Sequence, residues 1–113
     1  MKGAANGLST IEDIFFATNT SEERVLFLSV ILQALLDATK PAYPEEPENA
    51  ILERDQARAW FASSVGVTAK DFIEVCELAG VDPSYTKGFA YKVLESEEVP
   101  FIRKRINALL RHS

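Results

Sequence analysis

The feature that most constrains the fold is the nearly unbroken apolar stretch Val25–Leu36. On a helix, apolar side chains here cover almost the whole circumference and leave only a narrow polar strip of Ser29, Gln33 and Asp37. The stretch is far shorter than the roughly 20 residues that a helix needs to cross a bilayer. We therefore expect a helix over residues 21–39 that lies at the centre of its domain or forms a homodimer interface, and no membrane partner.

Both ends of this helix carry sequence signals. Thr20 and Glu23 have the spacing of a capping box, in which each side chain accepts a hydrogen bond from the other residue's backbone N–H. After the helix, three prolines fall within segment 40–49, and proline lacks the N–H that a continuing helix requires. We expect this Pro- and Glu-rich segment to be an extended connector with its glutamates in solvent.

Apolar spacing and capping residues predict further helices along the chain. In the first of these, Arg54 and Arg58 are expected to face water; Gly66 is expected to end it and Thr68 to cap the next. No segment alternates as a strand does. The sequence predicts an all-α fold, a compact bundle of four to five helices in a single domain, 1–113. The later helices are expected over about 50–63, 68–79, 83–94 and 100–111.

The apolar positions of these helices define an expected core. Residues 1–10 show little periodicity and are expected to be a mobile lead-in, followed by a short helical turn through Phe16. The core is expected to contain Leu28, Ile31, Leu35, Trp60, Phe61, Phe72, Val75, Cys76, Phe89 and Ile106.

Charge is distributed unevenly along the chain. The net charge is −5, yet residues 1–82 hold 6 basic against 14 acidic residues, whereas residues 83–113 hold 6 basic against 3 acidic residues. A polyanion is attracted to local positive charge rather than to a net value. A nucleic-acid partner should therefore meet the last third of the chain.

The segment from Asp71 to Leu94 resembles a helix-turn-helix. That motif needs a small residue on its first helix, a glycine for the positive φ of the turn and an aliphatic residue that packs between the helices, and Cys76, Gly80 and Val81 match these demands. Any pair of antiparallel helices has similar needs, so a purely structural pair stays an alternative. An interior glycine, Gly88, leaves the length of the second helix open.

A second likeness covers about residues 24–94. The combination of Leu32-Gln-Ala-Leu-Leu-Asp-Ala with Phe72-Ile-Glu-Val-Cys-Glu-Leu-Ala-Gly-Val-Asp-Pro resembles small uncharacterised helical proteins of phages and their bacterial hosts. The resemblance implies a small regulatory protein of phage type and supplies no active residues.

The first functional hypothesis is DNA binding through residues 83–111. In the helix-turn-helix interpretation, Tyr85, Thr86, Phe89, Ala90 and Val93 face the core. The side chains expected to face base edges are Ser84, Lys87, Tyr91 and Lys92. The side chains expected to contact phosphates are Arg103, Lys104, Arg105 and Arg111. The alternative is a protein-interaction or homodimerisation module that uses helix 21–39.

The residue types argue against an enzyme. The chain has one histidine, His112 near its end, and one cysteine, Cys76 on a core face, so neither a histidine-based catalytic pair nor a metal cage can be assembled. We expect no metal and no cofactor. A single cysteine also cannot form an intramolecular disulfide, and no secretion signal precedes the helices, which predicts a cytoplasmic protein.

Overall fold

The structure, a computed structural model, describes residues 21–111. Five helices follow one another in this range, and none of its residues is in a strand, so the predicted all-α bundle is confirmed. The segments for which we expected a mobile lead-in (1–10) and a short turn through residue 16 lie outside the described residues. The helices are α2 (Glu22–Ala38), α3 (Glu48–Ala62), α4 (Gly66–Ala79), α5 (Pro83–Glu95) and α6 (Val99–Arg111).

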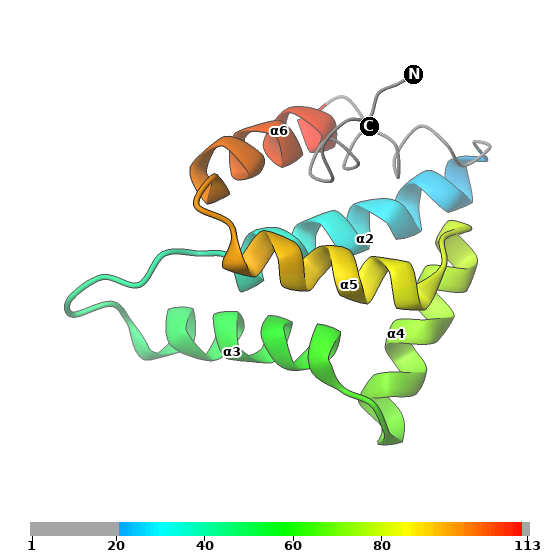
Figure 1. Ribbon diagram of the computed structural model, residues 1–113, viewed down its shortest axis with the longest axis horizontal. Coiled ribbons are helices and arrows are strands. Elements are labelled where there is room, and N and C mark those ends of the chain that lie inside the picture. Colours follow the sequence, from blue (N-terminus) through cyan, green and yellow to red (C-terminus); the bar gives the residue numbers. More distant parts are fainter. Residues whose placement is uncertain (1–20, 112–113) are drawn as a thin grey trace.

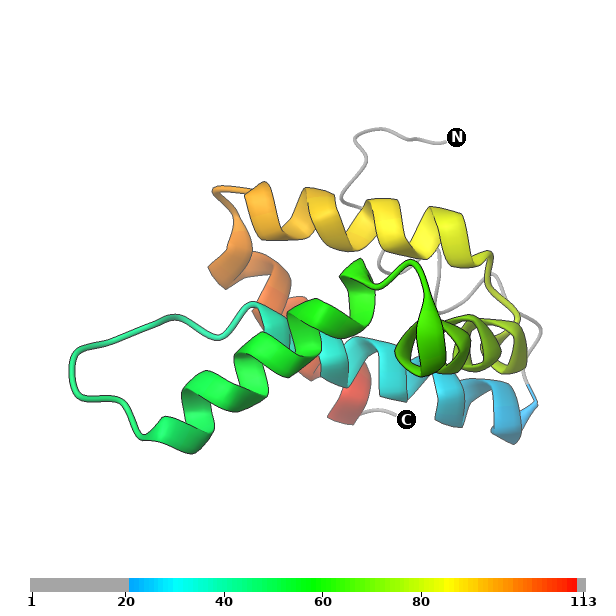
Figure 2. The same cartoon turned by 90° about the horizontal axis from the view of Figure 1, so that it is seen from below.

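Helix α2 is the central element, as its apolar circumference predicts. It packs against α3, α4 and α6, and α4 and α6 each pack against α5 as well. Figures 1 and 2 show α4 lying across one end of the bundle, where it joins α3 to α5. Helix α6 follows the other end of α5 (Figure 1). None of the helices between residues 21 and 111 has both the length and the apolar character of a membrane span.

The core is built from the side chains that periodicity selects, with two exceptions. Trp60 and Val75 are half-buried, and the other expected core residues are buried. The rings of Trp60, Phe61 and Phe72 meet edge to face, with centroids 5.0–5.8 Å apart. The indole Nε1 of Trp60 donates to Asp71 Oδ2 over 2.8 Å at the surface, which explains why this ring is not fully enclosed.

Two helix starts differ from the expected positions. Helix α2 is capped by Ser21, whose Oγ accepts from the backbone N of Arg24 at 3.1 Å, so the cap lies one residue after Thr20, which is outside the described range. Helix α3 ends at Ala62, and Gly66, expected to end it, instead begins α4 with a φ of +88°, so that expectation is wrong. The predicted cap at Thr68 is therefore wrong, because this residue already lies inside the helix.

The turn between α4 and α5 follows the sequence signals closely. Gly80 ends α4 with a φ of +78°, and Asp82 caps α5 by accepting from the backbone N of Tyr85 at 2.7 Å. Helix α5 continues through Gly88 to Glu95, which settles its length. These features show a helix pair joined by a short turn.

The core predicts the response to removing an aromatic ring. We expect Phe61→Ala to lower the free energy of unfolding by about 3–5 kcal/mol, because this ring is fully buried against those of Trp60 and Phe72. Trp60→Ala should cost less than Phe61→Ala, since part of the indole is already in solvent. Urea unfolding followed by circular dichroism measures both changes.

A matched control is Leu52→Ala on the same helix, because this side chain is 53% exposed. Its free energy of unfolding should change by less than about 0.5 kcal/mol. A Phe61→Ala variant no less stable than Leu52→Ala would contradict the core described above.

Candidate functional site

Helix α5 has one buried and one exposed face. Its buried residues, Thr86, Phe89, Ala90 and Val93, are spaced three and four apart and face the core as predicted. Tyr85, also expected to face inward, is 48% exposed. That expectation is wrong because Tyr85 lies one residue before the buried stripe, which is a rotation of about 100° on a helix of 3.6 residues per turn.

Three of the predicted base-contacting residues lie on the exposed side of α5: Ser84, Tyr91 and Lys92. Lys87 does not. Its Nζ donates to the carbonyl oxygen of Ser63, the residue that ends α3, over 2.9 Å, and lies 5.9 Å from the ring centroid of Phe72. A lysine that binds a helix C-terminus stabilises the fold. The expected outward position of Lys87 is therefore wrong.

The cations of α6 divide into two groups. Lys104 and Arg111 are exposed and, with Asn107, follow a spacing of three and four residues that places them on one outward face. Arg105 is half-buried, with its guanidinium 5.8 Å from the ring centroid of Phe101. The helix contains no acidic residue. Its outer surface therefore carries positive charges and no negative side chain of its own.

Arg103, predicted to contact phosphate, instead points into the protein. Its Nη1 donates to the carbonyl oxygen of Leu36 and, over 2.9 Å, to the Oγ1 of the buried Thr39. Both acceptors belong to the C-terminal end of α2, which has no basic residue in its own last turn. A cation is stabilising there because a helix C-terminus carries partial negative charge.

Two arginines of α3 bind the backbone at the same end of α2 or just after it. Arg58 Nε donates to the carbonyl oxygen of Ala38 over 2.8 Å, and Arg54 Nη1 is 3.5 Å from that of Lys40. Both were expected to face water: Arg58 is exposed as expected, whereas Arg54 is buried, so the expectation is wrong for Arg54. These contacts and that of Arg103 with Leu36 join residues 14 to 67 positions apart in the sequence. They could not be predicted from the sequence because no local pattern encodes such distant contacts.

The connector between α2 and α3 is more ordered than its composition suggests. A turn at Pro44 and Glu45, the latter with a φ of +64°, brings Glu46 back onto α3. The Glu46 carboxylate accepts two hydrogen bonds from Arg54, at 2.8 and 3.0 Å, and its side chain is 6% exposed. These bonds lower the pKa of Glu46. The expectation that all glutamates of segment 40–49 lie in solvent is therefore wrong.

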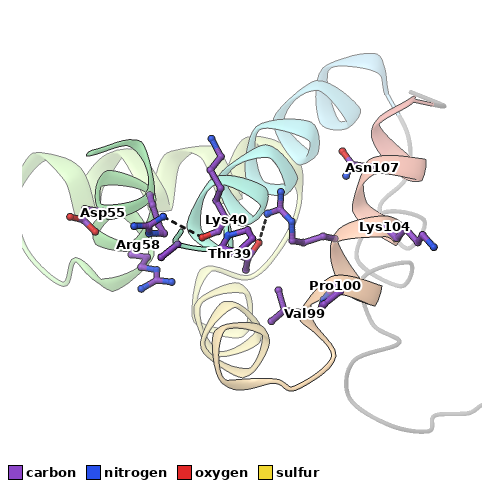
Figure 3. Close-up of a pocket in the computed structure, with 12 residues that line it drawn as sticks. Thr39, Lys40, Asp55, Arg58, Val99, Pro100, Lys104 and Asn107 are labelled. Carbon is purple, nitrogen blue, oxygen red and sulfur yellow. Dashed lines mark hydrogen bonds between the residues drawn. The ribbon is translucent and has the colours of Figure 1, made fainter. Parts of the chain in front are cut away.

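Arg54, Arg58 and Arg103 line an open pocket of about 800 Å³ between the C-terminal end of α2, α3 and α6. Its walls are residues 39–42, three side chains of α3 and five of α6. In Figure 3, Arg58 lies on one side and Lys104 on the other, with Thr39 between them. The Lys104 side chain extends from α6 toward solvent (Figure 3).

Cys76 is held as a thiol. Burial is the main cause that raises its pKa to about 11, against the opposing effect of a hydrogen bond with Thr86. At neutral pH its thiolate, the form that acts as a nucleophile or binds metal, is scarcely populated. Within residues 21–111 no three His, Cys, Asp or Glu side chains gather closely enough to hold a metal ion.

Comparison of the chain with known protein families, with curated proteins and with solved structures finds no match. The candidate functional surface is therefore defined by the geometry alone. It consists of the exposed side of α5, the outward cationic face of α6, and the arginine-lined pocket beside that face.

The inward position of Arg103 predicts a structural effect. We expect Arg103→Met to lower the free energy of unfolding by about 1.5–3 kcal/mol, the usual contribution of hydrogen bonds from a charged donor. The neighbouring change Lys104→Met is the matched control and should stay within about 0.5 kcal/mol, because Lys104 is exposed. Equal effects of the two variants in thermal or urea unfolding would show that Arg103 does not stabilise the end of α2.

Proposed function

We propose that the chain is a non-enzymatic, cytoplasmic DNA-binding protein of phage regulatory type that contacts DNA through segment 83–111. The observation that carries the proposal is the outward face of α6, where Lys104 and Arg111 lie together without any acidic residue on the helix, in a chain of net charge −5. Negative charge elsewhere repels DNA, so attraction favours one orientation.

Phosphate contacts are assigned to Lys104, Arg105 and Arg111. Arg103 is left out, because its hydrogen bonds to α2 already engage its guanidinium. Three phosphate contacts give a dependence of log affinity on log salt with a slope of about −3, which is a weak electrostatic attachment. Any sequence preference must then come from the neighbouring helix.

Helix α5 supports a role in reading base edges. It follows α4 after the short turn at Gly80, and Ser84, Tyr91 and Lys92 stand on its exposed side. Hydroxyl and ammonium groups can hydrogen-bond to base edges in the major groove. Lys87 is left out of this group because its amine donates to Ser63.

Substitutions of the phosphate-contacting residues and of the base-contacting residues should have different effects on DNA binding. Lys104→Ala and Arg111→Ala are expected to weaken binding to all sequences and to flatten the salt dependence by about one counterion for each lost contact. Tyr91→Ala and Lys92→Ala should mainly reduce sequence preference. Fluorescence anisotropy on a randomised duplex pool at two salt concentrations measures both effects.

Lys70→Ala is the control for these variants, because Lys70 is exposed on α4, outside the proposed contact segment. It should leave affinity and salt dependence unchanged. Absence of any binding by the unmodified protein at about 50 mM salt, where electrostatic attraction is strong, would overturn the proposal.

A second candidate function, homodimerisation through α2, has its own supporting observation. Leu26 is 60% exposed and Val30 is 41% exposed, and their spacing of four residues places them on one face of the helix. Exposed apolar side chains grouped on one face are typical of interaction sites. In this proposal two copies bury these faces against each other.

Light scattering at increasing concentration tests the dimer. We expect a dimer that Leu26→Lys dissociates without unfolding, because a buried unpaired charge opposes association. Leu52→Lys on α3 is the matched control, since that side chain is also exposed, and it should leave the mass unchanged. A monomer at every concentration would exclude this function.

A further inference from the structure

The pocket between α2, α3 and α6 contains cations of two kinds. Lys40 and Arg54 have acidic partners: Lys40 Nζ lies 3.5 Å from a carboxylate oxygen of Glu53, and Arg54 forms its two bonds with Glu46. The nearby carboxylate of Asp55 also acts on Arg54. Asp55 also lines the pocket, so three carboxylates face these two cations and about one negative charge is left over.

The other three cations of the pocket, Arg58, Arg103 and Lys104, form no ion pair with any acidic side chain in the described part of the chain. Arg58 and Arg103 face the C-terminal end of α2, which supplies only about half a negative charge. With the carboxylate of Asp55 included, the pocket thus carries an excess of roughly one and a half positive charges. An excess of this size in a protein of net charge −5 attracts an anion.

The arginines also keep hydrogen-bond donors for such an anion. A guanidinium has five N–H groups. The bond from Arg58 to the protein uses Nε, and the bonds from Arg103 use Nη1, so Nη groups of both side chains remain without a protein acceptor among residues 21–111. Lys104 lines the rim of the pocket with its side chain extended away from it into solvent (Figure 3), and the flexible stem of a lysine lets the ammonium turn toward a ligand.

We propose that this pocket binds a terminal phosphate group. A phosphomonoester carries a charge of about −1.5 to −2 at neutral pH, which matches the excess, and its oxygens accept from arginine in a bidentate manner. A phosphodiester within a strand carries only one charge. The pocket is larger than a phosphate, and Pro41, Ala42 and Val99 give it apolar walls for an organic group.

Two sources share this chemistry: the 5′ end of a nucleic-acid strand and a small phosphorylated molecule such as a nucleotide. The inference stands apart from the proposed DNA contacts of α6, because Arg58 belongs to the pocket alone and Arg111 to the outward face alone. An experiment can therefore contradict the phosphate pocket and leave the DNA proposal standing, or the reverse.

The test compares a 3′-labelled oligonucleotide carrying a 5′-phosphate with the same oligonucleotide carrying a 5′-hydroxyl, and measures adenosine monophosphate by calorimetry. If the source is a strand end, we expect the phosphorylated oligonucleotide to bind at least about tenfold tighter, because its terminal phosphate accepts charge-assisted hydrogen bonds from the arginines of the pocket. If the source is a small molecule, adenosine monophosphate itself binds. Equal binding of both oligonucleotides together with no binding of adenosine monophosphate overturns the proposal.

Variants of two pocket residues test whether the phosphate binds in this pocket. Arg58→Lys keeps the positive charge beside α2 but offers a single ammonium, and should reduce the phosphate-dependent binding about tenfold. Lys104→Gln should also reduce it, and this exposed change carries little risk to the fold. Circular dichroism confirms folding, and Lys70→Ala is the control expected to behave as the unmodified protein. Phosphate-dependent binding unchanged in both pocket variants would overturn the assignment to this pocket.

Arg111→Ala separates the pocket from the proposed DNA face. It should weaken binding to closed circular DNA, which has no strand ends, while leaving the ratio between the phosphorylated and hydroxyl oligonucleotides unchanged. If binding to circular DNA weakens but that ratio is one in the unmodified protein and adenosine monophosphate does not bind, the DNA proposal stands and the pocket inference falls. A ratio that drops to one in Arg111→Ala would place the phosphate on the outer face and contradict the pocket.

Discussion

The structure depends on how the C-terminal end of α2 is satisfied. The last carbonyl groups of a helix have no partner within the helix, and α2 has no basic residue in its last turn to bind them. Thr39 donates to two of these carbonyl groups, and Arg58 from α3 and Arg103 from α6 supply further donors. One helix end therefore fixes two other helices relative to the core.

This arrangement links stability to the candidate site. Glu46 holds Arg54 in place, and Arg54 in turn reaches the backbone at Lys40, so the connector between α2 and α3 closes one wall of the pocket. The arginines stabilise α2 with part of their donors and present the rest to the pocket. A ligand bound there would also neutralise charge that the fold brings together.

The sequence predicts the helices and most of the core because these depend on local periodicity and capping, as at Gly80 and Asp82. It does not predict the roles of Lys87 and Arg103. Both lie at the border between a buried and an exposed face, where a long side chain can reach either solvent or a neighbouring helix end. Only the packing of α3 and α6 decides between these directions, and residues distant in sequence set that packing.

The most direct test of this account is amide hydrogen exchange in Arg103→Met compared with the unmodified protein. If the end of α2 anchors the bundle, exchange should accelerate in α6 and in the last turn of α2, where the lost bonds lie, while α4, at the other end of the bundle, keeps its protection (Figure 1). Unchanged exchange in both α6 and the last turn of α2 would show that Arg103 does not hold these helices together, and would contradict the account.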